Sequence, residues 1–166
     1  MLMAAAPILA LTMTWTHNAS SRSDSYLGEL VSIDGLGVVH GISNGTARYF
    51  LSIPYGTVAK RFAAAQAAPA WHPRELDATA FGPMCVQTPV WYMPEFPQSE
   101  DCLSLNVFTP PESQLVASGE LLPVMVWIHG GGNLNGAARS PNFSGAHLVQ
   151  LGVVLVSINY LSLIHI

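Results

Sequence analysis

Charged residues are scarce in this sequence. Asp, Glu, Lys and Arg make up 10% of its 166 residues, whereas about 25% is usual in soluble domains. This scarcity excludes an intrinsically disordered chain and a coiled coil, because both depend on abundant charge. Six Lys and Arg residues and a formal net charge of −4 provide no basic surface, so we expect no nucleic-acid partner. Half of the residues are apolar, which is enough for the core of one domain.

Apolar stretches of the roughly 18 residues needed to cross a bilayer are also absent, so we expect no membrane span. The first 13 residues are apolar apart from Thr12. Their length matches the apolar part of a signal peptide, about 7–15 residues. We therefore predict a signal peptide over residues 1–19 and a secreted protein. An apolar N-terminal helix of a cytosolic protein is the alternative.

Cysteine is limited to Cys85 and Cys102, and no CxxC or Cys/His cluster predicts a metal site. An even number of cysteines in a secreted chain is consistent with a disulfide, and two free buried thiols are the alternative. Sequons for N-linked glycosylation occur at Asn18, Asn44 and Asn142. We name Asn44 and Asn142 as candidate glycosylation sites.

Short segments of alternating hydrophobicity predict strands in the first part of the chain. Asn44-Gly45 separates two of these segments and predicts a hairpin turn, because both residues tolerate a positive φ. Residues 54–100 contain seven prolines and predict a long packed loop with one helical turn. The predicted strands of this type cover residues 29–33, 38–42, 47–53 and 103–109.

Two nearly continuous apolar runs, residues 124–128 and 153–158, are typical of central strands buried on both faces. Residues 144–151 predict a short helix between them, ended by Gly152. The order of elements therefore predicts an α/β fold, in which antiparallel strands are followed by a β-α-β crossover in one mixed sheet.

The first apolar run ends in His129 and three successive glycines. Glycines let the backbone turn sharply and present its N–H groups outward. A dinucleotide-binding loop would need an acidic residue about 20 positions further on, but no Asp or Glu follows Glu120. The oxyanion loop of lipases and esterases, with its HGGG motif, fits better. A glycine turn needed only for packing is the remaining alternative.

Ordered sequence blocks across residues 29–160 make this chain resemble the type-B carboxylesterase/lipase family, which includes the cholinesterases. Two blocks stand out: Glu-Asp-Cys-Leu-Ser-Leu-Asn-Val, and Val-Trp-Ile-His-Gly-Gly-Gly, with Asn-Tyr after the next predicted strand. Asn133 stands where the family has an aromatic residue. The blocks that carry the resemblance are residues 50–56 with 61–62, 81–87, 100–107, and 126–132 with 159–160.

The resemblance implies the N-terminal portion of an α/β-hydrolase fold, truncated before the later strands. It also implies hydrolysis of small-molecule or lipid esters through a serine acyl-enzyme, without a metal or organic cofactor. The backbone N–H groups of Gly131 and Gly132 would be oxyanion donors. By the same resemblance, Cys85 pairs with Cys102 in a disulfide, and Arg61 forms a salt bridge with Glu100.

The nucleophile, acid and base of this family follow the oxyanion loop in the chain. The only G-x-S-x-G in this sequence is residues 41–45, inside the predicted hairpin, so we interpret Ser43 as a turn residue. His129 is expected to orient the loop and not to act as a base. We therefore expect residues 20–160 to be the N-terminal part of an esterase domain that is inactive alone. A non-catalytic cholinesterase-like adhesion or interaction module is the alternative.

Residues 161–166 read Leu-Ser-Leu-Ile-His-Ile, the translation of a common sequencing-adapter end. We expect this segment to be an artefact and leave it out of the fold prediction. The sequence makes no prediction of the oligomeric state.

Overall fold

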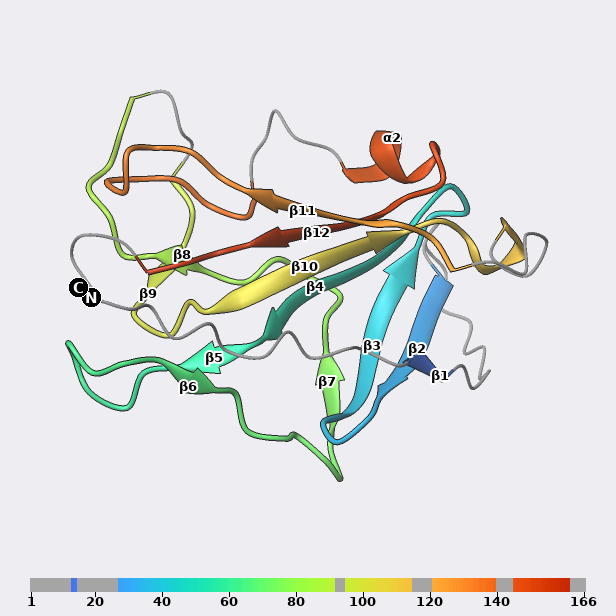
Figure 1. Cartoon of the computed structure of the whole chain (residues 1–166), viewed down its shortest axis with the longest axis horizontal. Coiled ribbons are helices and arrows are strands. Elements are labelled where there is room, and N and C mark those ends of the chain that lie inside the picture. Colours follow the sequence, from blue (N-terminus) through green and yellow to red (C-terminus); the bar gives the residue numbers. More distant parts are fainter. Residues whose placement is uncertain (1–12, 15–26, 92–94, 115–120, 140–144, 162–166) are drawn as a thin grey trace.

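The computed structural model describes residues 13–14, 27–91, 95–114, 121–139 and 145–161. They contain one mixed sheet of eight strands (Figure 1), in the order β1-β2-β3-β4-β10-β12-β11, with β7 paired to β3. The strands are β1 (Met13–Thr14), β2 (Leu27–Ile33), β3 (Gly37–Ser43), β4 (Arg48–Pro54), β7 (Glu75–Asp77), β10 (Ser104–Thr109), β11 (Val124–Ile128) and β12 (Val154–Ile158).

The first half of the sheet is antiparallel, as the alternating pattern predicts, because β2, β3, β4 and β10 pair in that sense. The turn between β3 and β4 is held by Asn44, whose side-chain oxygen accepts from the N–H groups of Thr46 and Ala47 at 3.1 and 3.0 Å. Gly45 has a φ of 79°. The predicted Asn-Gly hairpin is therefore confirmed.

The second half of the sheet contains the predicted β-α-β crossover. Strands β11 and β12 are parallel and aligned from Val124↔Val154 to Ile128↔Ile158. Helix α2 (Gly145–Val149) connects them, and Gly152, with a φ of 80°, follows its last turn. The helix is shorter than the predicted residues 144–151, of which residue 144 lies outside the described chain.

Strand β12 lies between β10 and β11, so β11 is the outermost strand of the described sheet. The prediction that β11 is buried on both faces is wrong: Val124, Met125, Val126 and Ile128 are 46–62% exposed. Strand β11 is hydrogen-bonded to a described strand on one side only. Trp127 packs against the core cluster that contains Val149 of α2, and the other four side chains are open. In β12, Leu155 and Ser157 on one face are fully buried, whereas Val154, Val156 and Ile158 on the other face are partly buried.

The core divides between the two faces of the sheet. Val107 belongs to a cluster with Phe50 and Val39, whereas Phe108 belongs to a second cluster with Val149 of α2. Consecutive residues of a strand point to opposite faces, so Val107 and Phe108 pack on different sides. A Cβ at Gly145 would collide with the Phe108 ring, which explains how closely α2 approaches the sheet.

Residues 54–100 differ from the predicted loop with a helical turn. The described residues of this segment form short strands and turns but no helix. Strands of two or three residues are too short to produce a hydrophobic period, so only tertiary contacts determine them. Besides β7, they are β5 (Gly56–Thr57), paired with β6 (Gln66–Ala67), and β8 (Met84–Cys85), paired with β9 (Gln98–Ser99).

Within the described residues, no helix has the length and hydropathy to span a membrane. Most of the predicted signal peptide lies outside the described residues. Its Met13 and Thr14 form β1, opposite Ile33 and Ser32 of β2.

Candidate functional site

The glycine-rich or oxyanion loop (residues 129–138) begins where β11 ends, at the carboxyl end of the parallel strand pair (Figure 1). Ligands of α/β sheets bind at this end of the strands. The N–H groups of Leu134 and Asn135 both donate to the carbonyl of Gly131, at 3.0 and 3.3 Å, and close a tight turn. Gly131 and Gly132 have φ values of 126° and 62°. This region of φ favours glycine, so the loop depends on these residues.

The two predicted oxyanion donors are available to a ligand. Gly131 and Gly132 are exposed. Among the described residues, neither N–H group is donated to a protein acceptor. Backbone N–H groups held in this way can bind the negative oxygen of a tetrahedral intermediate.

His129 is buried beneath the loop and orients it. Its ring stacks on Tyr160, with centroids 4.4 Å apart, and its Nδ1 lies 2.9 Å from the carbonyl oxygen of Gly130. Burial lowers the pKa of His129, so the ring is neutral at pH 7 and Nδ1–H donates to that carbonyl. The Tyr160 hydroxyl donates to the His129 carbonyl at 2.8 Å. These contacts agree with an orienting role for His129.

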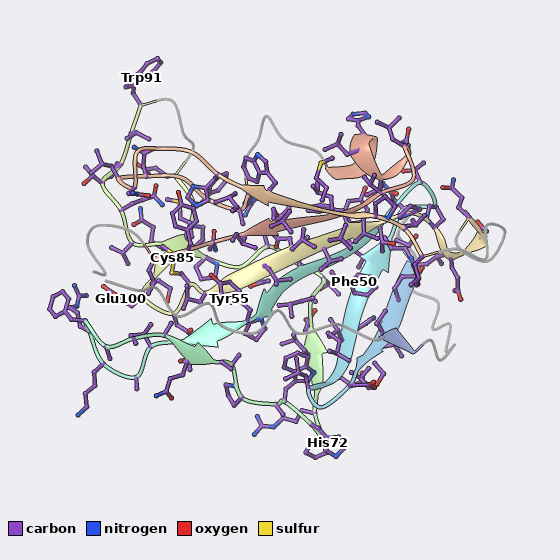
Figure 2. All side chains as sticks on the ribbon, viewed as in Figure 1. Phe50, Tyr55, His72, Cys85, Trp91 and Glu100 are labelled. Carbon is purple, nitrogen blue, oxygen red and sulfur yellow. A yellow bond between two sulfur atoms is a disulfide. The ribbon has the colours of Figure 1, made fainter. Side chains whose placement is uncertain are left out.

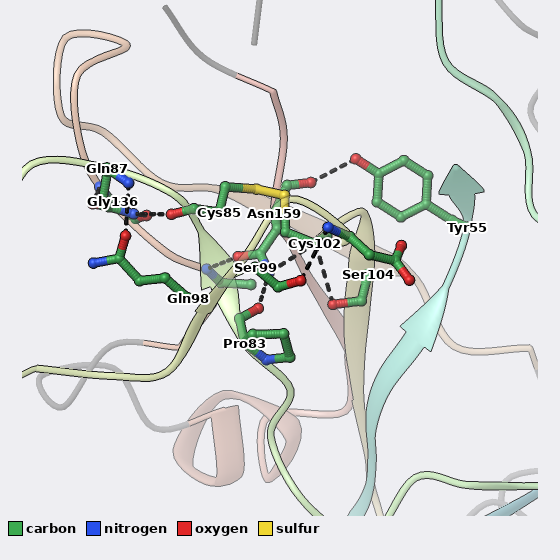
Figure 3. Close-up of a disulfide and its surroundings, with 12 residues drawn as sticks. Tyr55, Pro83, Cys85, Gln87, Gln98, Ser99, Cys102, Ser104, Gly136 and Asn159 are labelled. Atoms are coloured by element: carbon green, nitrogen blue, oxygen red, sulfur yellow. Dashed lines mark hydrogen bonds between the residues drawn. A yellow bond between two sulfur atoms is a disulfide. The ribbon is translucent and has the colours of Figure 1, made fainter. Parts of the chain in front are cut away.

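Two buried amide side chains, Gln87 and Asn159, form hydrogen bonds with the backbone of the loop (Figure 3). Gln87 donates from Nε2 to the carbonyl of Gly136 at 2.8 Å and accepts from the Gly136 N–H at 2.7 Å. Asn159, at the end of β12, accepts from the Ala138 N–H at 2.8 Å. Its Nδ2 donates to the carbonyls of Pro83 and Cys102, at 3.2 and 3.1 Å.

Sequence reasoning assigned no role to Gln87 or Asn159, although both lie in blocks that carry the family resemblance. Gln87 is 9% exposed and Asn159 is 5% exposed. Buried amides almost always make hydrogen bonds, but their partners are distant in sequence. A polar residue inside an apolar segment was the only available signal.

The structure joins the pairs that the resemblance implies. Cys85 and Cys102 form a disulfide, with Cα atoms 4.9 Å apart. The disulfide closes residues 85–102, here called the disulfide loop, and Gln87 of this segment contacts the glycine-rich loop. Arg61 Nη2 bonds to Glu100 Oε1, but the two side chains are 53% and 52% exposed.

Side chains from distant parts of the sequence lie at the end of the sheet that carries the glycine-rich loop (Figure 2). Cys85, Glu100 and Tyr55 lie there together, and Trp91 projects away from the sheet. Trp91 is 96% exposed. The Tyr55 hydroxyl donates to the carbonyl of Asn159 at 2.5 Å, and burial raises its pKa. The end of β4 is thereby tied to the end of β12.

The remaining candidates lie elsewhere. Ser43 is buried in the β3–β4 hairpin, where its hydroxyl donates to the Ala47 carbonyl at 3.3 Å and accepts from the Gly45 N–H. These contacts are those of a turn serine. Asn44 is exposed in the same turn, and Asn142 lies outside the described residues. The described part of the chain contains no group of three His, Cys, Asp or Glu that could bind a metal.

A mixed sheet with an antiparallel start, a parallel crossover and a glycine loop after β11 is the N-terminal portion of an α/β-hydrolase. A solved structure of a PNB esterase matches it with a TM-score of 0.70 and 36% identity, over 80% of this chain and 28% of that chain. A carboxylesterase of Geobacillus stearothermophilus matches with a TM-score of 0.64 and 32% identity, over 77% and 25%.

The sequence comparisons agree. The model of the carboxylesterase family matches residues 28–161, and this chain belongs to that family. Para-nitrobenzyl esterase of Bacillus subtilis (strain 168) is 37% identical over 132 residues, 75% of this chain and 26% of the esterase. Liver carboxylesterase of Sus scrofa is 36% identical over an alignment of 173 residues, gaps included, which covers 92% of this chain and 28% of that enzyme. The chain thus spans about a quarter of the length of these relatives.

Proposed function

We propose that this chain contributes the oxyanion-hole part of a serine hydrolase that cleaves small-molecule or lipid carboxylic esters. One observation carries the proposal. The N–H groups of Gly131 and Gly132, at the carboxyl end of β11, are exposed and donate to no acceptor among the described residues. Family membership and the sequence identity to carboxylesterases support the same reaction.

In this reaction a serine oxygen attacks the ester carbonyl, whose oxygen becomes negatively charged. The N–H groups of Gly131 and Gly132 stabilise that charge, and a third donor follows the nucleophile in such folds. Removing a single donor of this kind lowers kcat by a factor of about 10²–10³. The alcohol leaves from the tetrahedral intermediate, and water then hydrolyses the acyl-enzyme.

The nucleophile, acid and base of the proposed enzyme come from outside these 166 residues. The only G-x-S-x-G of the sequence contains Ser43, which the hairpin uses for turn hydrogen bonds. The 166-residue chain alone should therefore not hydrolyse aryl esters above a buffer blank. Turnover that disappears in Ser43→Ala would contradict this proposal.

Secretion is part of the proposal. A disulfide between Cys85 and Cys102 favours an oxidising compartment, and Asn44 presents its sequon on an exposed turn. Secreted protein should carry an N-linked glycan, seen as extra mass that a glycosidase removes. Loss of this extra mass in Asn44→Gln would support the proposal. An unglycosylated protein retained in the cytosol would refute it.

The decisive experiment is to sequence the transcript beyond the codon for Tyr160 and to express the complete encoded protein. We expect a G-x-S-x-G motif downstream, hydrolysis of p-nitrophenyl esters, and covalent labelling by a fluorophosphonate probe. Replacement of the motif serine should abolish both activity and labelling. A complete protein without that serine would instead be the non-catalytic interaction module.

A further inference from the structure

We propose that Gln87 is a positioning residue for the oxyanion hole: the disulfide loop sets the orientation of the Gly131 N–H through Gln87. This inference rests on the proposed esterase function. It assigns a role to a side chain that touches neither the substrate nor the reacting atoms.

Gln87 contacts the glycine-rich loop as a two-point clamp. Its amide donates to the carbonyl of Gly136 and accepts from the N–H of the same residue, at 2.8 and 2.7 Å. The second N–H of the amide donates to the Cys85 carbonyl at 3.0 Å. Both N–H groups and the oxygen of the buried Gln87 amide therefore have hydrogen-bond partners, and the geometry of the side chain is strongly restricted.

Gly136 transmits this restriction to the oxyanion loop. It has a φ of 128°, and a Cβ on it would collide with the His129 ring and the Gly130 carbonyl. The His129 ring therefore packs directly on Gly136. A shift of the Gly136 backbone must move that ring.

The last step leads to the donor itself. His129 Nδ1 lies 2.9 Å from the carbonyl oxygen of Gly130. That carbonyl and the N–H of Gly131 belong to one planar peptide group. Holding the carbonyl therefore fixes the direction in which the Gly131 N–H points. The chain of contacts runs from Gln87 through Gly136 and His129 to the donor.

A glycine-rich loop needs such external support. Glycine has the greatest backbone freedom of any residue, whereas oxyanion donors are effective only when held in place before the reaction. Gln87 can provide this support because its own backbone is anchored. It lies two residues from Cys85, and its N–H donates to Gln98 Oε1 at 2.8 Å.

The test uses the complete protein encoded by the transcript and three variants. Gln87→Met keeps a side chain of similar length but removes all hydrogen bonds to Gly136. Gln87→Glu keeps the acceptor and loses the donor. Ser99→Ala is the matched control, because Ser99 makes a hydrogen bond within the disulfide loop, to the Asp101 N–H, and none to the glycine-rich loop.

Amide hydrogen exchange measures positioning without reference to activity. In Gln87→Met we expect peptides covering residues 129–138 to exchange at least about 10-fold faster, with the strands of the sheet unchanged. Ser99→Ala should leave these peptides as in the wild type. Unchanged exchange at residues 129–138 in Gln87→Met would overturn the proposal.

Kinetics measure the consequence. Gln87→Met should lower kcat about 10-fold and change KM less than about twofold, because the oxyanion contact forms in the transition state. The kcat of Gln87→Glu, relative to wild type, should rise as the pH falls from about 8 to about 5, because a protonated carboxyl can donate again to Gly136. The kcat is expressed per active site by titration, so that a pH-dependent change in the amount of folded protein does not produce this rise.

The outcomes separate the inference from the proposed function. A wild-type protein without esterase activity refutes the proposed function, and hydrogen exchange still decides whether Gln87 positions the loop. An active wild type with a normal kcat in Gln87→Met refutes the inference alone. A relative kcat of Gln87→Glu that does not change with pH also refutes it.

Discussion

Neighbouring glycines of the oxyanion loop should differ sharply in their tolerance of alanine. At Gly131 an added Cβ would collide with the carbonyl oxygen of Asn135, and φ is 126°. At Gly130 the same Cβ meets no atom within 4 Å, and φ lies outside the left-handed region. Gly132 is intermediate, because its Cβ has open space but φ is 62°.

Gly131→Ala must therefore open the turn that Leu134 and Asn135 close on the Gly131 carbonyl, which displaces the donor. Loss of one donor costs about 2.7–4 kcal/mol of transition-state stabilisation, or about 10²–10³ in kcat. Gly132→Ala should lower the free energy of unfolding by about 1–2 kcal/mol, from backbone strain alone. The kcat of Gly130→Ala should remain within about threefold of the wild-type kcat, because the added Cβ causes neither a collision nor backbone strain.

The assay is kcat and KM for a p-nitrophenyl ester in the complete protein, with active-site titration to count folded enzyme. Thermal unfolding of each variant separates loss of the donor from loss of the fold. If Gly130→Ala is as damaging as Gly131→Ala, the loop geometry described above is not the cause. A wild-type kcat in Gly131→Ala would refute the role of this loop as the oxyanion hole.

Further predictions concern stability and can be checked by urea unfolding of the complete protein or by chromatography of the 166-residue chain. Asn159→Leu should lower the free energy of unfolding by about 3 kcal/mol, because two buried and one partly buried side-chain hydrogen bonds of about 1 kcal/mol each are lost; a change below about 1 kcal/mol would contradict their importance. Replacing Cys85 and Cys102 by Ser should cost about 3 kcal/mol, since the bond closes a loop across 17 positions, and reductant should then have no further effect. Arg61→Ala should cost only about 0–1 kcal/mol, and less at high salt, because the ion pair is half exposed; a loss of several kcal/mol would show that the pair is buried in the complete protein. The 166-residue chain should aggregate through β11, an exposed apolar edge, and Val126→Lys should raise the monomer fraction in size-exclusion chromatography; a soluble monomer without that change would refute this expectation.

Local features of the fold could be predicted from the sequence because they depend on residues close together in the chain. Alternating hydrophobicity predicted β2, β3, β4 and β10. The Asn44-Gly45 pair predicted the hairpin between β3 and β4. The family resemblance predicted the fold and named Gly131 and Gly132 as donors. For Gly131 the structure adds the steric reason, which is the close approach of the Asn135 carbonyl.

Features that depend on distant residues appeared only in the tertiary structure. The apolar runs that form β11 and β12 look alike in sequence, yet β12 lies between two strands and β11 lies at an edge, because strand order is set by pairing and not by composition. The two-residue strands of residues 54–100 carry no periodic signal. Gln87 and Gly136 are 49 positions apart. No local pattern indicates that the side-chain amide of Gln87 would form hydrogen bonds with the backbone of Gly136. A chain's periodicity reports which face of an element is apolar, whereas the partner of a buried polar group is decided only when the elements pack.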